Sequence, residues 1–408
     1  MLSTPLRGAL AFLLAASPLT AAPSIIVTLN NVADRVRAEN PDLAAARLQI
    51  DEAVGRRKQA GRLANPELET SFEHNPRFRE GKVEVGIARR FPLTQRLRLE
   101  KAVSATQVQA AEAEVRNVER KLIAEAREAV VNVLAIRQRR ELLKSQANVS
   151  RDFATFLDDV AKKGEGSSLD AGLAKLEAAT LNTELSQLDA EETTTIGILK
   201  PLLGLRPNTS INISGTLAEP SLPSSDTNPG RRPDLQAATL DAKAAGQAVA
   251  LEQSRRYEDV EAAVFAGAER SEDAPEGYDN EAVLGVRLKI PLPFWNKNEG
   301  AIQEAQATQT RKQKEATALA RSIRLDAETA RQEMQQWAKL VTEFRTSLIP
   351  LAEEQSSFAE SSYRNGQAEI QTVFRSREKR LQVAAARIDA LRQFHLARVR
   401  YEAALAIP

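Results

Sequence analysis

The sequence predicts a mainly α-helical fold with a small β part, built as two repeats of helix, strand, strand, long helix and helix. Three observations lead to this fold class. Aromatic residues make up 4% of the chain and charged residues 27%, and Ala, Leu, Glu, Gln and Arg dominate, as in long helices with polar outer faces. Four sequence landmarks recur in the same order in both halves. Two helical segments are too long for a compact globular domain.

The charge balance and the cysteine count exclude several classes of protein. The chain has 56 Lys and Arg against 55 Asp and Glu, so no overall charge excess attracts nucleic acid or an anionic membrane surface. It has no cysteine, which excludes disulfides, thiolate metal ligands and a lipidated N-terminal cysteine. We therefore expect no nucleic-acid partner.

Residues 1–22 have the pattern of a secretory signal peptide. Arg7 supplies a positive charge, residues 9–16 are apolar, and Thr20-Ala21-Ala22 offers small residues for cleavage. The cleavage position is open because Pro23 follows directly, and a disordered or helical N-terminus is the alternative. After this segment no stretch approaches the roughly 18 to 20 apolar residues of a membrane-spanning helix. A membrane role would therefore require strands.

The internal repeat sets the expected domain organisation. The paired landmarks are 40–43 with 232–235, 85–87 with 284–286, 91–93 with 290–292, and Gly164 with Gly366.

From these pairs we expect a first repeat over 23–204, an irregular linker over 205–231 that holds a brief strand near 211–213, and a second repeat over 232–408. The expected strands lie near 66–74, 82–92, 259–270 and 282–292.

The strand segments alternate between apolar and polar residues, the period expected of a sheet with two different faces. Such alternation suits a barrel wall with one face toward lipid and the other toward water. An ordinary half-buried soluble hairpin fits it equally well. The clearest apolar series are Val83, Val85 and Ile87 in the first repeat and Leu284, Val286, Leu288 and Ile290 in the second.

The helices carry apolar residues at spacings of three and four, as in a coiled-coil seam. Trp337 falls on this seam, so we expect it to be a packing residue. The long helices over about 96–162 and 299–364 would each span roughly 100 Å. The shorter helices stack end to end to nearly the same length, near 42–63 with 169–203 and near 234–256 with 368–404. The predicted arrangement is two antiparallel pairs of long rods.

Four strands cannot close into a barrel, because the smallest membrane barrels use about eight. In a bilayer the unpaired groups of an open edge cost several kcal/mol each. If the strands span a membrane, the chain must therefore form a homo-oligomer. Two copies would supply eight strands and three copies twelve, and the residues alone leave both open.

Over roughly residues 28–405 the sequence resembles the TolC-like outer-membrane efflux proteins. The resemblance rests on 40–43, on Asn65-Pro66-Glu67-Leu68, on 232–235, on the two strand-to-helix junctions and on the Gly-containing helix breaks. The second junction, Ile290–Gly300, is similar to that of the CzcC-type cation-efflux branch, where a Pro-Leu-Pro run precedes an Asn-rich helix start.

This resemblance implies a homotrimer in the outer membrane of a Gram-negative bacterium, with a twelve-stranded β-barrel in lipid and a long α-helical barrel in the periplasm. The implied partners are a periplasmic adaptor (membrane fusion) protein, an inner-membrane pump of the resistance-nodulation-division type, and outer-membrane lipid. The implied function is passive conduction of substrates, with heavy-metal cations as the expected cargo. The alternative is a periplasmic adaptor or coiled-coil scaffold protein of an export system.

In this family the helix breaks form the periplasmic tip, where acidic residues often ring the entrance. Asp170, six residues after Gly164, matches one acidic position. The equivalent position after Gly366 is Thr372, and the next acidic position is Arg375. These three residues are the gate candidates, either through pairing of Asp170 with Arg375 or as ordinary solvated charges.

We expect the remaining singled-out residues to be structural. Gly164, Gly166 and Gly366 supply unusual backbone angles at the tip turns, and Pro92, Pro291 and Pro293 mark the strand-to-helix junctions. Trp295 is either an anchor at a membrane interface or a turn-packing residue.

Catalysis has little support. His74 and His395 are the two histidines and lie far apart, and there is no phosphate loop or nucleophile motif. We therefore expect no enzyme activity, cofactor or metal site.

Overall fold

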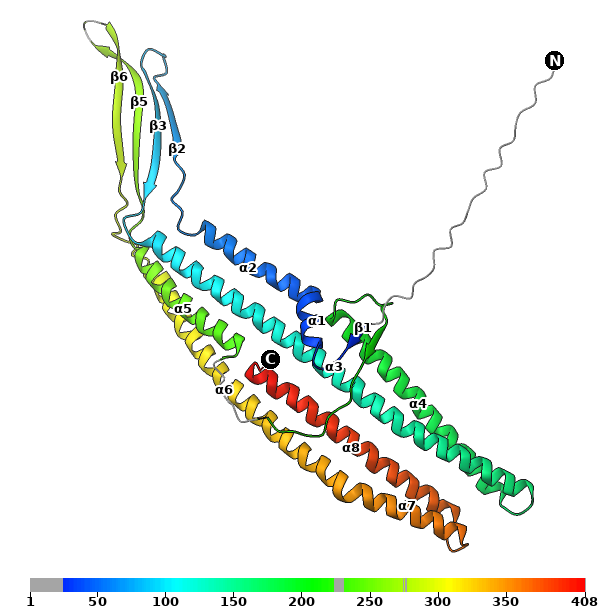
Figure 1. Cartoon of the computed structure of the whole chain (residues 1–408). Helices are drawn as coiled ribbons and strands as arrows, with labels where there is room; N and C mark the ends of the chain where they lie inside the picture. Colours follow the sequence, from blue (N-terminus) through cyan, green and yellow to red (C-terminus); the bar gives the residue numbers. More distant parts are fainter. Residues whose placement is uncertain (1–24, 224–230, 274, 276, 408) are drawn as a thin grey trace, which may run out of the picture.

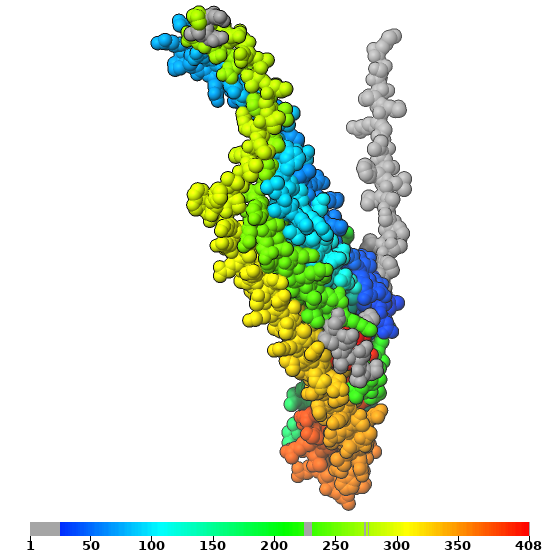
Figure 2. Space-filling model, turned by 90° about the vertical axis from the view of Figure 1, so that its left-hand side faces the viewer, coloured from blue at the N-terminus to red at the C-terminus, as the bar shows by residue number. Residues whose placement is uncertain are grey.

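The computed structural model describes residues 25–223, 231–273, 275 and 277–407, so the expected signal peptide lies outside the described residues. The molecule is elongated, with one antiparallel sheet at one end and a layer of long helices below it (Figure 1). Seen after a turn of 90°, the helical part is narrow and curved (Figure 2). The helices therefore form a layer rather than a globular bundle.

Helix α3, Arg96–Lys162, runs the whole length of this layer. Its 67 residues span about 100 Å. The second long rod, expected as one helix over 299–364, is divided into α6 (Glu299–Glu343), one π-helical turn η2 (Phe344–Leu348) and α7 (Ile349–Arg364). Pro350, the second residue of α7, has no N–H to donate and so interrupts the regular helical ladder just after the π turn.

The shorter helices flank α3 in two tiers (Figure 1). Near the sheet the order across the layer is α2, α3, α5, α6, and toward the other end it is α4, α3, α8 and then α6 to α7. The layer is one helix thick and has two open edges. The short helices are α1 (Val32–Glu39), α2 (Pro41–Gln59), α4 (Ser168–Leu202), α5 (Pro233–Ser254) and α8 (Ile370–Leu405).

Among the described helices, none is long and apolar enough to cross a membrane.

The main sheet joins the two repeats. Its order is β2-β3-β5-β6, and every neighbouring pair is antiparallel. The central pair, β3 with β5, brings Val85 opposite Ala266 and so connects strands from different repeats. The strands are β2 (Glu67–His74), β3 (Gly81–Phe91), β5 (Val260–Asp273) and β6 (Gly277–Lys289).

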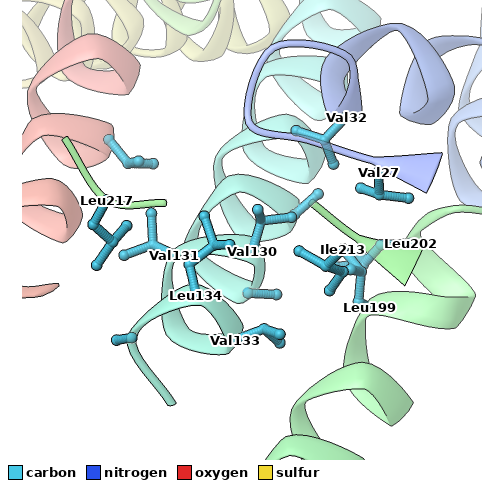
Figure 3. Packing of buried hydrophobic residues seen from close by; sticks show 14 of the residues in the cluster. Val27, Val32, Val130, Val131, Val133, Leu134, Leu199, Leu202, Ile213 and Leu217 are labelled. Carbon is cyan, nitrogen blue, oxygen red and sulfur yellow. The ribbon is translucent and has the colours of Figure 1, made fainter. Parts of the chain in front are cut away.

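A second, two-stranded sheet lies at mid-length and organises the main core. Strand β1 (Ile25–Val27), which the sequence did not predict, pairs in parallel with β4 (Ile211–Ile213), the brief strand expected in the linker. Together they cover the middle of α3 and the end of α4 (Figure 3). The cluster includes Val27, Val32, Val130, Val133, Leu134, Leu199, Leu202 and Ile213.

The linker after β4 is packed against helices rather than loose. A ring nitrogen of His395 on α8 lies 2.8 Å from the Ala218 carbonyl oxygen. Glu219 pairs with Arg387 on α8 and, at 3.8 Å, with Arg345 in the π turn. Residues 214–223 therefore form a strap that holds α8 and the π turn together.

Candidate functional site: the sheet faces, the junctions and the helical tip

The sheet presents one continuous apolar face to solvent. Residues directly opposite each other in an antiparallel ladder point to the same face, so the register determines which side chains share it. Its members are largely exposed, with Leu284 at 82% and Val286 at 75%. A soluble hairpin would bury this face, and no described part of the chain covers it. The face includes Leu68, Thr70, Phe72, Val83, Val85, Ile87, Ala262, Val264, Ala266, Ala268, Ala282, Leu284, Val286 and Leu288, with Arg89 on the same face at the base of the sheet.

The opposite face is charged and mainly acidic. By the same register its described side chains include eight carboxylates and four cations, an acidic surplus within each chain. The carboxylates are Glu67, Glu69, Glu73, Glu84, Glu261, Glu269, Asp279 and Glu281, and the cations are Lys82, Arg90, Arg287 and Lys289.

Ion pairs across the strands knit this polar face. The Arg287 guanidinium lies 3.1 Å from Glu84 and 3.3 Å from Glu69, and Lys82 Nζ lies 2.7 Å from Glu84. Glu84 is nearly buried although it sits on a sheet surface. The polar face is therefore the more crowded of the two.

Glycine makes this crowding sterically feasible. The Phe265 ring lies on the polar face, with the Arg287 guanidinium 4.9 Å from its centroid. A Cβ at Gly285 would be 2.4 Å from that ring, and a Cβ at Gly86 would be 2.9 Å from the Phe265 Cβ. These two positions therefore require glycine, which the landmarks 85–87 and 284–286 share.

The three junction prolines lie where strands become helices. Pro92 follows the last residue of β3, and Pro291 and Pro293 follow the end of β6. A proline cannot donate a ladder hydrogen bond, which ends the strand there. The predicted strand over 282–292 accordingly ends earlier, at Lys289.

A charged cavity of about 520 Å³ lies at the same level. Arg96, the first residue of α3, holds it together by contacting Asp259 at 2.6 Å and Glu100 at 2.7 Å. Because carboxylates and guanidinium groups line it in pairs, the cavity is a structural link between sheet and helices.

At the far end, the two tip turns have the same backbone geometry. Gly164 and Gly366 have φ values of +80° and +71°. After each, the next residue donates back to the helix: Glu165 to the Val160 oxygen at 3.1 Å and Gln367 to the Ser362 oxygen at 2.8 Å. This is the Schellman C-cap, which favours glycine. Gly166 is crowded instead, because a Cβ there would be 2.9 Å from the Val160 side chain.

The three gate candidates lie close to these turns, in the first turns of α4 and α8. Asp170 is half-buried, whereas Thr372 and Arg375 are exposed. Within the described part of the chain no ion pair joins Asp170 to Arg375. Asp170 instead lies near Tyr363 of α7: burial and the nearby Asp170 carboxylate both raise the pKa of the Tyr363 hydroxyl.

An aromatic and cationic cluster, which sequence reasoning missed, joins the two repeats beside this point. We call it the tip seam: Phe153 of α3, Tyr363 of α7, and Phe374 and Arg377 of α8. The Phe153 ring lies 6.3 Å from Tyr363 and 6.2 Å from Phe374, both edge-on. The Arg377 guanidinium lies 4.4 Å above Phe153 and 2.8 Å from Glu360.

Because charges at helical spacing are typical of a solvated face, the sequence did not single out Arg377. Its side chain is in fact only 5% exposed. An aromatic at position 153 on the helical stripe was the available signal. Glu177 of α4 and Arg377 line the same cavity. Burial raises the pKa of the Glu177 carboxyl, and the Arg377 charge opposes that shift. The tip seam is therefore the place where a buried charge holds α8 against α3.

A separate charged contact fastens α4 to α3 near the same end. The Asp158 carboxylate lies 2.7 Å from Lys162 and 2.6 Å from Lys175. Hydrogen bonds from these two ammonium groups lower the pKa of Asp158 to about 2. Near the tip, α3 is therefore joined both to α4 of its own repeat and to the helices of the second repeat.

In the described ranges, no group of three or more His, Cys, Asp or Glu residues is arranged to hold a metal ion. His74 stacks on Phe78 with ring centroids 3.9 Å apart, and His395 holds the strap at mid-length. Each histidine thus makes its own local packing contact, in a different part of the molecule.

Comparisons with known proteins place this architecture. No family model matches the sequence. The cobalt-zinc-cadmium resistance protein CzcC of Cupriavidus metallidurans is 26% identical over 284 residues, which is 68% of this chain and 66% of that protein. The matched region thus spans just under two thirds of the relative's length.

Solved structures agree with the fold over more of the chain. The outer-membrane channel OprN superimposes with a TM-score of 0.76 at 17% identity, covering 92% of this chain and 89% of OprN. CusC gives 0.77 at 14% identity, covering 92% and 91%. VceC of Vibrio cholerae gives 0.76 at 19% identity, covering 92% and 95%. The predicted fold class and the predicted resemblance are both confirmed.

Proposed function

We propose that this chain, which has the TolC-like outer-membrane channel fold and resembles CzcC in sequence, is the outer-membrane channel component of a tripartite efflux system. In this proposal it conducts substrates passively from pump and adaptor to the exterior of a Gram-negative bacterium. The pump supplies the energy, and the helical part lies in the periplasm.

The observation that carries the proposal is the sheet, with an exposed apolar face opposite a charged one. Strands β2 and β6 are both open edges in a single chain. In lipid such edges must be paired, so copies of the chain must supply the missing neighbours. Three copies give the twelve strands that the resemblance implies, and the same symmetry joins the open edges of the helical layer into a tube.

Matched variants on the two faces test this proposal. Val286 lies on the apolar face, whereas Val283 lies on the polar face of the same strand. A lysine in the lipid-facing position costs about 2 to 4 kcal/mol at the bilayer midplane. We therefore expect Val286→Lys to abolish recovery of a trimer from outer membranes and Val283→Lys to preserve it. Equal recovery of both variants, or a wild-type protein found as a soluble monomer, would contradict the channel.

The same experiment separates the channel from a periplasmic adaptor or scaffold. An adaptor would have no reason to expose so broad an apolar sheet face. If the protein were an adaptor, both Val286→Lys and Val283→Lys would be recovered equally in the soluble periplasmic fraction.

For cargo, we propose heavy-metal cations. Two observations support this: the acidic surplus of the polar face, which in a closed assembly lines the path, and the likeness to a cobalt-zinc-cadmium resistance protein. A path lined with carboxylates raises the local concentration of cations. Deleting the gene should lower tolerance to cobalt, zinc or cadmium salts and leave antibiotic tolerance unchanged. Unchanged metal tolerance would contradict the cation assignment.

We propose that the gate lies at the tip, where Asp170, Thr372 and Arg375 stand beside the tip seam. Opening requires the α7–α8 pair to separate from α3–α4, which breaks the contact between Arg377 and Phe153. Adaptor binding opens the gate if it favours the separated form. In planar bilayers Arg377→Met should raise the conductance of the purified channel. Arg375→Met, measured in the same assay, tests whether Arg375 pairs with a neighbouring copy. A conductance equal to wild type in both variants would place the gate elsewhere.

A further inference from the structure

The segment between β6 and α6 projects from the side of the molecule at the base of the sheet (Figure 2). Its apolar side chains are among the most exposed in the chain, and Trp295 is 96% exposed. Leu292 and Phe294 are also exposed, and Phe294 packs edge-on against Trp295 with ring centroids 6.3 Å apart. We call residues 292–295 the aromatic knob.

The knob is held in place rather than hanging from a free loop. Asn298, just before α6, has a φ of +58°, a left-handed conformation that costs energy in a residue other than glycine. Three hydrogen bonds compensate: its N–H donates to Asn296 Oδ1 at 3.0 Å, and its Nδ2 donates to the Glu252 carbonyl oxygen at 2.9 Å and carboxylate at 3.0 Å. Helix α5 therefore fixes the direction in which the segment leaves the layer.

The apolar face of the sheet continues directly into the knob. Leu288 is the last β6 residue on that face, and Ile290 and Leu292 extend the exposed series beyond the strand. On the neighbouring junction Phe91 and Leu93 are exposed at the same level. The knob therefore continues the apolar surface of the sheet.

Its composition is that of a boundary between lipid and water. Aromatic residues, tryptophan above all, concentrate where an apolar band meets the polar headgroups. Cationic side chains accompany it: Lys297 follows the knob, and the Arg89 guanidinium lies 5.6 Å from the Phe91 ring. The first junction, Leu93-Thr94-Gln95, has no such aromatic pair at the corresponding position.

We infer that the aromatic knob is an anchor that inserts into the headgroup region of the periplasmic leaflet of the outer membrane, where its occupant is phospholipid. This inference rests on the proposed function. It assigns one anchor to each chain, supplied by the second repeat alone, and it sets the depth at which the sheet sits in the bilayer. Asn298 is a positioning residue for this contact.

The chain carries its own reporter, because Trp295 and Trp337 are its two tryptophans. Trp337 lies near the C-terminal end of α6 and packs against the helical core clusters. The experiment reconstitutes full-length protein into vesicles of phosphatidylcholine and phosphatidylglycerol that carry a nitroxide either at the headgroup or near the acyl end. The Trp337→Phe variant isolates Trp295, and Trp295→Phe isolates Trp337 as the matched control.

We expect the headgroup nitroxide to quench Trp295 about twofold more strongly than the acyl-end nitroxide, as for a residue at the interface. Neither label should quench Trp337. If Trp337→Phe fails to fold, the difference in quenching between wild type and Trp295→Phe gives the same quantity. Replacing Asn298 by Ala should reduce the headgroup quenching of Trp295, because the segment is then no longer held.

Two failures are distinguishable. If the protein floats with the vesicles as a trimer but neither label quenches Trp295, the knob contacts a neighbouring copy or water, and the anchor is refuted while the channel stands. If the protein does not float with vesicles at all, both the anchor and the proposed function are refuted.

Discussion

The two junctions where shorter helices stack end to end share a backbone motif but are closed by different side chains. In the first repeat α4 is followed by Gly204 and meets α2 at Asn40. In the second repeat α8 is followed by Ala406 and meets α5 at Arg232. Both helices end in a Schellman turn, with φ values of +64° at Gly204 and +51° at Ala406. The repeated landmarks 40–43 and 232–235 thus begin equivalent helices in unequal surroundings.

The first junction is neutral and tight. Asn40 is 3% exposed; its Oδ1 accepts from the Leu43 N–H, and its Nδ2 donates to the Leu202 carbonyl oxygen, both at 2.8 Å. One amide therefore caps the start of α2 and the end of α4 together. Gly204 packs so closely on Glu39 that no side chain fits between them.

The second junction is charged and looser. Arg120 reaches in from α3 and donates to the Ala403 oxygen at 2.9 Å, while Arg232 pairs with Asp234 at 2.9 Å. Cavities of about 220 Å³ and about 360 Å³ lie beside it. The same backbone motif can thus be closed by a tight neutral contact or by a looser charged one. We expect the second repeat to unfold first.

The largest expected effect is from Gly204→Ala. A Cβ there would lie 2.0 Å from the Glu39 carbonyl oxygen, at a φ that side chains disfavour. We expect the free energy of unfolding in detergent to fall by about 3 kcal/mol. Denaturant titration followed by circular dichroism measures it.

The matched control is Ala406→Gly, in the equivalent turn of the second repeat. It should stabilise by about 1 kcal/mol, because glycine removes the left-handed strain. Two changes of the same sign would break the comparison.

Asn40→Ala should have the next largest effect. It removes the cap of α2 and leaves the Leu202 carbonyl without its donor, for a loss of about 2 kcal/mol. Asn40→Asp keeps the acceptor and loses the donor, so its loss should be intermediate in the same titration. An Asp variant as unstable as Ala would show that the bond to Leu202 matters more than the cap.

Arg120→Gln should cost less, about 1 kcal/mol. The Ala403 carbonyl loses its donor, but a buried charge next to Arg232 is also removed. Burial, reinforced by Arg232, already lowers the pKa of Arg120, so the charge is held at some cost. The same denaturant titration measures the change. A loss greater than that of Asn40→Ala would reverse the order of the two junctions.

Acidification should produce the smallest effect, confined to the second repeat. Burial lowers the pKa of His395, an effect opposed by its hydrogen bond to Ala218, with Arg398 and Glu402 nearby. The folded protein thus favours the neutral ring, so this stabilisation is complete above about pH 6.5, the unfolded value, and is lost as pH falls toward the folded pKa. We expect a decrease below about 1 kcal/mol between about pH 7 and pH 5.

Unfolding midpoints of wild type and His395→Gln at several pH values measure this effect. The wild type should lose more stability on acidification than the variant. Parallel pH profiles would show that the strap does not depend on His395.

Local pattern predicted the elements well because it depends on near neighbours in sequence. The prolines and glycines that begin and end the helices, such as Pro41 and Gly366, act through their own backbone angles. The alternation along β6 likewise comes from its own residues. The parallel pair of β1 with β4 was missed because it joins segments about 185 residues apart. The π turn was also missed, although Pro350, which interrupts the helical ladder, stands in the sequence.

The sequence by itself determined the duplication, the two faces of each strand and the lengths of the rods, since periods of two and of three to four are properties of the chain. Tertiary structure alone decided that β3 pairs with β5 to make one sheet from two repeats, that Arg377 is buried against Phe153 rather than solvated, and that Asp170 lies near Tyr363. Each of these depends on which distant segments meet, and contacts between residues far apart in sequence are determined only when the whole chain folds.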